Sequence, residues 1–239
     1  IMSSVGDGGE SEYYNVEEYY RVRVGAEKIY LLNFERTVEE IFRGEGNQVS
    51  KDTINLGIRS SDVDFKANET GNVICFVQQG ELWSYNQVEN KMTQVFSFRS
   101  QEGMDIRENY NEHDIRILRT TDEGGSMDFV VYGYMNRGEH EGQVGVSVCH
   151  YDCLTNTVEE MLFVPTTLSY EIVKEQIGKL MYVSDSGTFY MTISNQVYKI
   201  DLNTKKAEVF IDDLKPDMLA NSEDGRYIAW TEDGSTMHV

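Results

Sequence analysis

Two short patterns alternate along this chain, and each of them occurs four times. In the first pattern, a pair of apolar residues at alternating positions precedes an Asn or Asp, and a second apolar segment then ends on a large side chain. The four copies span residues 28–42, 81–96, 146–162 and 196–210, with Asn33, Asn86, Asp152 and Asp201 at the Asx position. An Asx side chain can cap a tight turn between two strands, so each copy predicts a β-hairpin.

In the second pattern, a small polar residue is followed three positions later by a glycine and then by an apolar strand. The copies span residues 68–77, 121–134, 184–193 and 222–230, with Gly71, Gly124, Gly187 and Gly225 in the turn. A turn of this kind needs a residue at positive φ, which glycine adopts freely. The apolar segments that precede these turns, and would be the first strands, are 63–67, 115–119, 179–183 and 217–220.

Because the two hairpin types alternate, one repeat contains strand A, a glycine turn, strand B, a link, strand C, an Asx turn and strand D. A four-stranded antiparallel meander of this kind is the blade of a β-propeller. The sequence therefore predicts an all-β fold, with propeller blades across residues 21–239. The predicted units are a half blade at 21–43, blades at 62–98, 113–164 and 179–211, and a half blade at 217–239.

The complementary half blades leave two architectures open. They could pair and close a four-bladed propeller, or the chain could be part of a propeller with roughly six to eight blades. Blades of about 45 residues make a seven-bladed ring longer than about 300 residues, so we favour the partial propeller. An open arc would leave strand edges bare and would allow self-association.

The N-terminal segment differs in composition from the repeats. Residues 1–20 include SSVGDGGESE at 3–12, which is rich in glycine and acidic residues and nearly free of apolar ones. This composition predicts a flexible, linker-like arm. The YYNVEEYY sequence at 13–20 has two interpretations, an acidic aromatic contact segment or the start of a strand that packs on the first hairpin.

Residues 222–230 read SEDGRYIAW. This segment resembles the Ser-x-Asp-Gly-(Lys/Arg)-Tyr-Ile-Ala pattern in propellers of the Tol-type translocation protein and in the propeller domain of prolyl oligopeptidase. The resemblance is close only here, and it implies the propeller fold and a bacterial, extracytoplasmic or cell-surface setting. It does not select a function, because such propellers serve transport complexes, peptidases and scaffolds alike.

The charge balance limits the partners that this chain can attract. The chain has 21 Lys and Arg residues against 41 Asp and Glu residues, which gives a net charge of −20. This charge repels nucleic acids and anionic membranes, and it steers cationic partners towards the protein. No stretch approaches the roughly 18 apolar residues of a membrane-spanning helix, so we expect no membrane insertion.

The cysteines and acidic residues do not form a recognisable cofactor motif. The three cysteines are Cys75, Cys149 and Cys153, too few for a disulfide framework. The CHYDC sequence contains potential zinc ligands, but the alternation of a strand places Cys149 and His150 on opposite faces. We therefore expect Cys75 and Cys149 to be buried, and we predict no metal site and no cofactor.

The sequence also lacks the common catalytic signatures, including the nucleophile elbow, the paired-histidine zinc helix and the phosphate-binding glycine loop. It therefore predicts a non-catalytic propeller module for interaction or sensing. The alternative is an accessory propeller of a larger enzyme, such as a peptidase, with its catalytic domain outside these residues.

Loop length indicates which end of the propeller is the working surface. The A–B and C–D turns lie at one end of the blades, and the long connections at 99–113, 136–143 and 164–179 all belong to the other end; the last of them could contain a helical turn. Long loops on a rigid scaffold commonly bind partners, so we expect a protein, peptide or glycan there, unless these loops are plain surface insertions. The candidate binding residues are Arg99, Arg107, Tyr110, His113, Arg137, His140 and Tyr170.

Overall fold

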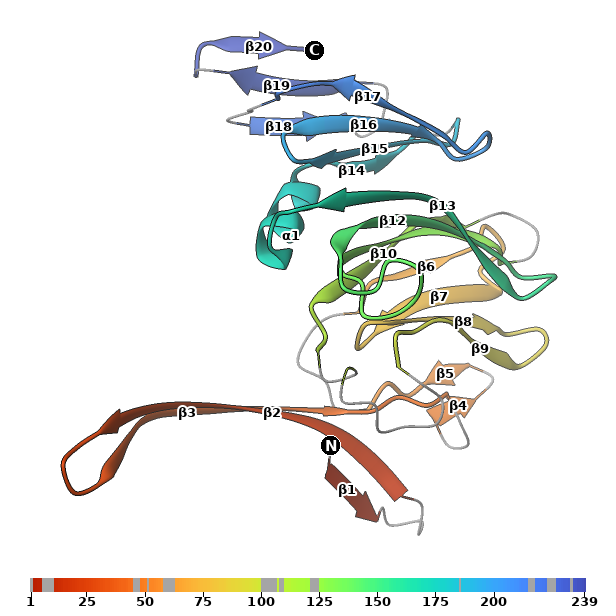
Figure 1. Ribbon diagram of the computed structural model, residues 1–239. Helices are drawn as coiled ribbons and strands as arrows, with labels where there is room; N and C mark the ends of the chain where they lie inside the picture. Colours follow the sequence, from red (N-terminus) through yellow and green to blue (C-terminus); the bar gives the residue numbers. More distant parts are fainter. Residues whose placement is uncertain are drawn as a thin grey trace.

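The antiparallel sheets of the protein follow one another along an arc (Figure 1). The computed structural model describes residues 2–5, 11–44, 48–50, 52–57, 63–99, 107, 110–120, 125–184, 186–214, 218–222, 227–232 and 234–239. These residues form twenty strands and one helix. Among the residues that the structure describes, no helix is long and apolar enough to cross a membrane.

Three of the sheets are four-stranded meanders, which we name blades 1, 2 and 3. Blade 1 contains β6 (Phe65–Ala67), β7 (Val73–Gln78), β8 (Glu81–Asn86) and β9 (Lys91–Phe96). Blade 2 contains β10 (His113–Thr120), β11 (Met127–Tyr134), β12 (Val144–Asp152) and β13 (Thr157–Thr166). Blade 3 contains β14 (Met181–Val183), β15 (Thr188–Ile193), β16 (Gln196–Asp201) and β17 (Lys206–Ile211). The predicted all-β fold of propeller blades is confirmed.

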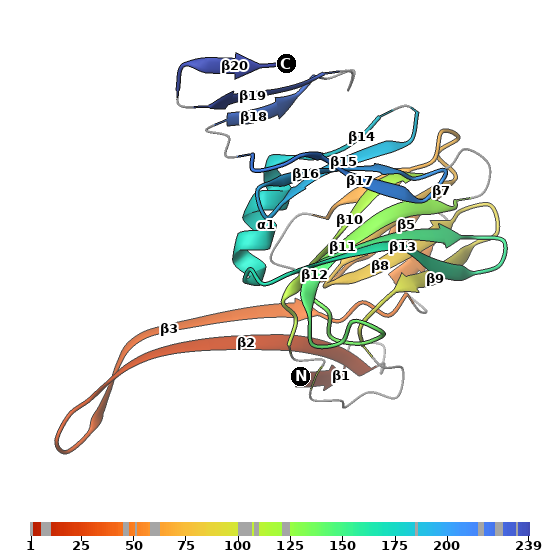
Figure 2. The same ribbon diagram turned by 45° about the horizontal axis from the view of Figure 1, so that its top comes forward.

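The two ends of the chain form separate sheets. The C-terminal sheet contains β18 (Met218–Asn221), β19 (Ile228–Glu232) and β20 (Thr236–His238). The N-terminal strands are β1 (Met2–Val5), β2 (Ser11–Val24), β3 (Ile29–Glu40), β4 (Val49–Ser50) and β5 (Thr53–Ile54). Figure 2 shows the N-terminal and C-terminal sheets at opposite ends of the arc. The described residues therefore do not form the closed four-bladed ring that was the alternative.

Neighbouring blades pack face to face through strands that are apolar on both sides. On β11, Phe129 and Val131 join the core between blades 1 and 2, whereas Val130 and Tyr132 join the core between blades 2 and 3. This division follows from the period of two along a strand, which sends successive side chains to opposite faces. Because β11 is buried on both faces, it reads in the sequence as a continuous apolar run rather than as an alternation.

The predicted Asx turns form in all three blades. The Oδ1 atom of each Asx residue accepts hydrogen bonds from the backbone N–H groups two and three residues later. These distances are 3.0 and 3.1 Å at Asn86, 2.8 and 3.2 Å at Asp152, and 2.9 and 3.0 Å at Asp201. The backbone donors hold the pKa of both aspartates below its ordinary value. The local sequence therefore determines these C–D connections.

The prediction that the first copy of the Asx pattern, at residues 28–42, forms a hairpin with a turn at Asn33 is wrong. Asn33 lies inside β3 and pairs with Arg21 of β2, so no turn occurs there. β3 instead pairs along its length with β2, which includes residues that were predicted to form a linker-like arm. The run of Tyr and Val residues in 13–24 suits a strand, and a long ladder with β3 satisfies more backbone groups than a short hairpin at Asn33 would.

Two of the four predicted turn glycines lie within the described residues. Gly71 and Gly187 adopt φ values of 71° and 81°, and each N–H donates to a backbone carbonyl at 2.9 Å. Gly124 and Gly225 lie outside the described residues.

Valine at Gly71 or Gly187 should lower the free energy of unfolding by about 1–3 kcal/mol, because a β-branched residue is strained at positive φ. A Cβ atom at Gly71 would meet nothing within 4 Å, so only backbone strain acts there. A Cβ at Gly187 would lie 2.5 Å from Nη1 of Arg119, which would also have to move. Urea denaturation measures both losses. Asn tolerates positive φ better than valine, so Gly71→Asn should cost less, and an equal loss would contradict the strain argument.

Candidate binding site at the long-loop end

The long connections of the propeller meet at one end of blades 1 and 2. Nδ2 of Asn136, in the β11–β12 loop, donates to the backbone carbonyls of Arg107 and Tyr110, in the β9–β10 connection, at 2.6 and 3.1 Å. Nη1 of Arg107 also lies 2.7 Å from Oε1 of Glu141. We name this end the long-loop end. Two of the insertions that the sequence assigned to one end are therefore in direct contact.

The third insertion contains helix α1 (Tyr170–Lys179), where a helical turn was predicted. Val173 and Ile177 of this helix are fully buried in the core between blades 2 and 3. The hydroxyl of Tyr170 donates to Oδ2 of Asp114 at 2.7 Å, and Nζ of Lys174 lies 2.8 Å from the same atom. Burial and the bond to Asp114 raise the pKa of the Tyr170 phenol. Tyr170 thus attaches the helix to β10.

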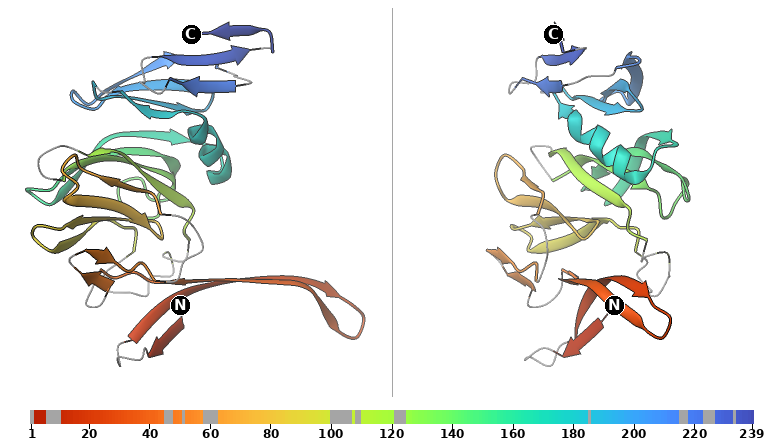
Figure 3. Two further views of the ribbon diagram at one scale, coloured as in Figure 1. Left: turned by 180° about the vertical axis from the view of Figure 1, so that it is seen from behind. Right: turned by 90° about the vertical axis from the view of Figure 1, so that its left-hand side faces the viewer.

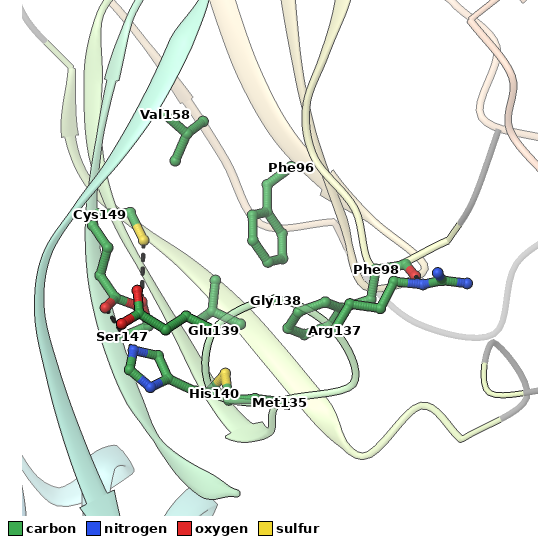
Figure 4. Close-up of a pocket in the computed structure, with 12 residues that line it drawn as sticks. Phe96, Phe98, Met135, Arg137, Gly138, Glu139, His140, Ser147, Cys149 and Val158 are labelled. Atoms are coloured by element: carbon green, nitrogen blue, oxygen red, sulfur yellow. Dashed lines mark hydrogen bonds and ion pairs between the residues drawn. The ribbon is translucent and has the colours of Figure 1, made fainter. Parts of the chain in front are cut away.

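A pocket of about 240 Å³ lies between the outer strands of blades 1 and 2, beside the β11–β12 loop. Its apolar wall consists of Phe96, Phe98, Val131, Met135 and Val158. Its polar wall and mouth consist of Arg137, Gly138, Glu139, His140, Ser147, Cys149 and Glu160. Figure 4 shows the Phe96 ring between the Ser147 and Cys149 side and the Phe98 and Arg137 side. The pocket is therefore amphipathic, with an aromatic wall opposite a polar one.

The carboxylate of Glu160 is the centre of the polar wall. The hydroxyl of Ser147 donates to its Oε2 atom at 2.6 Å, and Nε2 of His140 donates to its Oε1 atom at 2.7 Å. The His140 ring is stacked on Phe163, with ring centroids 3.7 Å apart and an interplanar angle of 7°. These contacts orient the carboxylate, whose side chain remains 36% exposed. A partly exposed carboxylate with fixed geometry can accept a further hydrogen bond from a cation.

The arrangement of these groups does not suit nucleophilic catalysis. Ser147 and His140 both donate to Glu160, so the imidazole is not placed to take the proton of the serine hydroxyl. Cys149 is buried on β12, and burial raises the pKa of its thiol to about 12, which keeps it protonated at neutral pH. Among the described residues, no three His, Cys, Asp or Glu side chains are grouped to hold a metal ion.

Two predicted residues, Arg99 and His113, lie near the turn at Gly80, where His113 is buried and Arg99 is partly exposed. Nε2 of His113 donates to the backbone carbonyl of Gly80 at 2.9 Å, and the ring packs edge-on against Phe98. Burial lowers the pKa of His113, so the imidazole is neutral at pH 7. Nη1 of Arg99 lies 3.9 Å from the buried carboxylate of Glu81. Nη2 of Arg99 donates to the backbone carbonyl of Gln79 at 3.5 Å, so both side chains contact the turn.

The seven predicted residues therefore have three different placements. Arg137 and His140 line the pocket. Arg107 and Tyr110 are exposed at the rim of the long-loop end. Arg99, His113 and Tyr170 hold the loops and the helix in position. Sequence reasoning missed Phe96, Phe98, Ser147 and Glu160, which were assigned only to strands or strand ends.

The comparisons with known proteins concern the fold. No family model matches this sequence, and no curated protein matches it. The chain is similar to the solved structure of TolB from Acinetobacter baumannii, with 14% identity, a TM-score of 0.41, and coverage of 85% of this chain and 45% of that one. It is also similar to dipeptidyl peptidase 4 from Porphyromonas gingivalis, with 10% identity, a TM-score of 0.45, and coverage of 93% and 36%.

A third similar structure is the tricorn protease, with 15% identity, a TM-score of 0.40, and coverage of 96% of this chain and 18% of that one. The chain thus spans less than half the length of each of these proteins. They include a Tol-type protein and peptidases, which are the classes that the segment at 222–230 resembles.

Proposed function

We propose that this chain is a non-catalytic propeller module that binds a protein or peptide at the long-loop end and holds one side chain of that partner in the pocket between blades 1 and 2. The observation that carries this proposal is the pocket itself. Its volume of about 240 Å³ is below the roughly 300–1,000 Å³ of typical small-molecule sites, and it suits a single large side chain.

The chemistry of the pocket favours a lysine or arginine of the partner. The aliphatic stem of such a residue packs against the apolar wall of Phe96, Phe98 and Met135, and its charged head reaches Glu160. Glu139 also lines the pocket and adds negative charge. The net charge of −20 increases the rate at which a cationic partner arrives.

Glu160→Gln should weaken the binding of a lysine side chain about tenfold, because it removes the charge from the hydrogen bond to the ammonium group. The probes are Nα-acetyl-lysine amide and its uncharged analogue Nα-acetyl-norleucine amide, titrated against the native chain by NMR. We expect the lysine probe to bind more tightly and its advantage to disappear in the variant.

Glu159→Gln is the matched control, since Glu159 precedes Glu160 on β13 but faces away from the pocket and pairs with Lys205. Equal loss of lysine binding in both variants would contradict a site in the pocket. For a natural partner captured by pull-down, Arg107→Ala, Tyr110→Ala and Arg137→Ala should weaken capture without changing the unfolding transition. Changes in the Asx turns at the opposite end should leave capture intact.

A further inference from the structure

A small cavity lies beside the turn at Gly80, where blade 1 meets blade 2. Figure 3 shows these two sheets side by side, with blade 1 in gold and the first strands of blade 2 in light green. We name this space, which has a volume of about 10 Å³, the Gly80 cavity. Of its lining residues, only Phe98 also lines the larger pocket described above. The Gly80 cavity is therefore a separate site.

Three side chains that line the Gly80 cavity carry a buried nitrogen without a hydrogen-bond partner among the described residues. These atoms are Nε2 of Gln79, Nη1 of Arg99 and Nδ1 of His113. His113 as a whole is only 5% exposed. Buried polar groups in folded proteins are almost always hydrogen-bonded, because an unpaired group loses its hydration without replacement. Three unpaired nitrogens around one cavity therefore indicate a ligand inside it.

The protonation of the three nitrogens determines which hydrogen bonds this ligand must make. Nε2 of Gln79 and Nη1 of Arg99 carry hydrogens and can only donate. Nε2 of His113 donates to the backbone carbonyl of Gly80 at 2.9 Å, so Nδ1 of the neutral ring has a lone pair and can only accept. Burial lowers the pKa of His113 and keeps the ring neutral at pH 7. The ligand must therefore accept two hydrogen bonds and donate at least one.

The carboxylate of Glu81 provides a second acceptor in the lining of the cavity. Its Oε1 atom lies 3.9 Å from Nη1 of Arg99, which is too far for a direct hydrogen bond. A small molecule that accepts from Arg99 and donates to Glu81 can bridge a distance of this kind. The Glu81 side chain is only 6% exposed, and a buried carboxylate needs such donors to replace its hydration.

We propose that the Gly80 cavity binds one structural water molecule. The water accepts hydrogen bonds from Gln79 and Arg99, and it donates to His113 and Glu81. A buried water makes roughly two to four hydrogen bonds and needs at least about 10–15 Å³ of space. The Gly80 cavity, with a volume of about 10 Å³, thus holds a single water and is too small for a side chain of a partner.

Monatomic ions suit the lining of the cavity less well than water does. A cation would meet the guanidinium charge of Arg99 and the amide hydrogens of Gln79. Chloride would meet the lone pair of His113 and the negative charge of Glu81. A water molecule satisfies all four groups, because it donates and accepts at the same time.

The water joins segments that are distant in the sequence. Gln79 lies in the turn between β7 and β8, Arg99 follows β9, and His113 is the first residue of β10. The β9–β10 connection carries Arg107 and Tyr110 of the long-loop end. The water therefore links the start of this connection to its end, a role that does not depend on the partner proposed above.

Oxygen-17 magnetic relaxation dispersion of the full chain tests the proposal, because it counts the waters that stay bound for longer than the protein takes to rotate. We expect Gln79→Met to remove one such water, since methionine fills a similar space but supplies no N–H donor. Gln78→Met is the matched control. The buried amide of Gln78 donates to the backbone carbonyl of Leu56 at 3.3 Å and does not line the cavity, so this variant should keep the native count.

A second measurement uses the native chain alone and decides the question even if Gln79→Met does not fold. The ring C–H of His113 that lies between the two ring nitrogens should show a nuclear Overhauser effect to water. Absence of this effect, or a water count that Gln79→Met leaves unchanged, would overturn the proposal. Faster chloride-35 relaxation in the native chain than in Gln79→Met would also overturn it, in favour of a bound anion.

Discussion

Gly133→Ala should lower the free energy of unfolding of the propeller more than the same substitution at the other glycines named above, and it should also loosen the long-loop end. Gly133 has a φ of 120°, a conformation that costs a residue with a side chain about 1–3 kcal/mol. A Cβ there would lie 2.4 Å from the carbonyl oxygen of Glu112 and 2.9 Å from Cα of His113. Both are backbone atoms of the paired segment, so overpacking adds about 1–3 kcal/mol.

The same Cβ would lie 2.8 Å from the ring of Tyr170, which attaches helix α1 to β10. Urea denaturation of Gly133→Ala therefore measures the combined loss, and near-ultraviolet circular dichroism reports the displacement of the tyrosine. Gly138→Ala is the control, because Gly138 has a φ of 92° but a Cβ there would meet nothing within 4 Å. Gly138→Ala should lower the free energy of unfolding only by the cost of backbone strain. An equal loss of stability at the two glycines would contradict the packing argument.

Phe129→Ala should lower the free energy of unfolding by about 3–5 kcal/mol, the usual cost of removing a buried aromatic ring. Phe129 is fully buried on β11, in the core that joins blades 1 and 2, and its ring centroid lies 5.9 Å from that of Phe96. The cavity would release Phe96, which forms part of the pocket wall. We therefore expect weaker binding of the norleucine probe as well as lower stability.

Phe210→Ala provides the comparison for this second change. Phe210 is 51% exposed on β17, so the same truncation there should cost about 1 kcal/mol or less. Guanidinium titrations of both variants give the two losses. A similar loss at both positions would show that the core between blades 1 and 2 does not hold the arc together.

The candidate site contains residues that the sequence analysis did not predict. Arg137 and His140 were predicted because they lie in a long loop, but Glu160, which His140 contacts, was assigned only to a strand. The register between β12 and β13 shifts between Val148 and Cys149, so Cys149 pairs with Glu160 and Ser147 reaches its carboxylate. A shift of this kind depends on how two strands meet, and neither strand reveals it alone.

The repeated sequence patterns of this chain determined its blades, because each Asx or glycine turn depends on interactions among a few neighbouring residues. The Asx side chains of Asn86, Asp152 and Asp201 bond to their own turns, and Gly71 and Gly187 adopt the positive φ that their turns need. Only the tertiary structure decided the strand pairing at the N-terminus. The segment around Asn33 carries the same local signal as the true turns, yet it forms the middle of β3, because a long ladder with β2 was available. Local hydrogen bonds can be predicted from neighbouring residues, whereas the pairing of β3 with β2, the pocket and the Gly80 cavity depend on segments that meet only when the chain has folded.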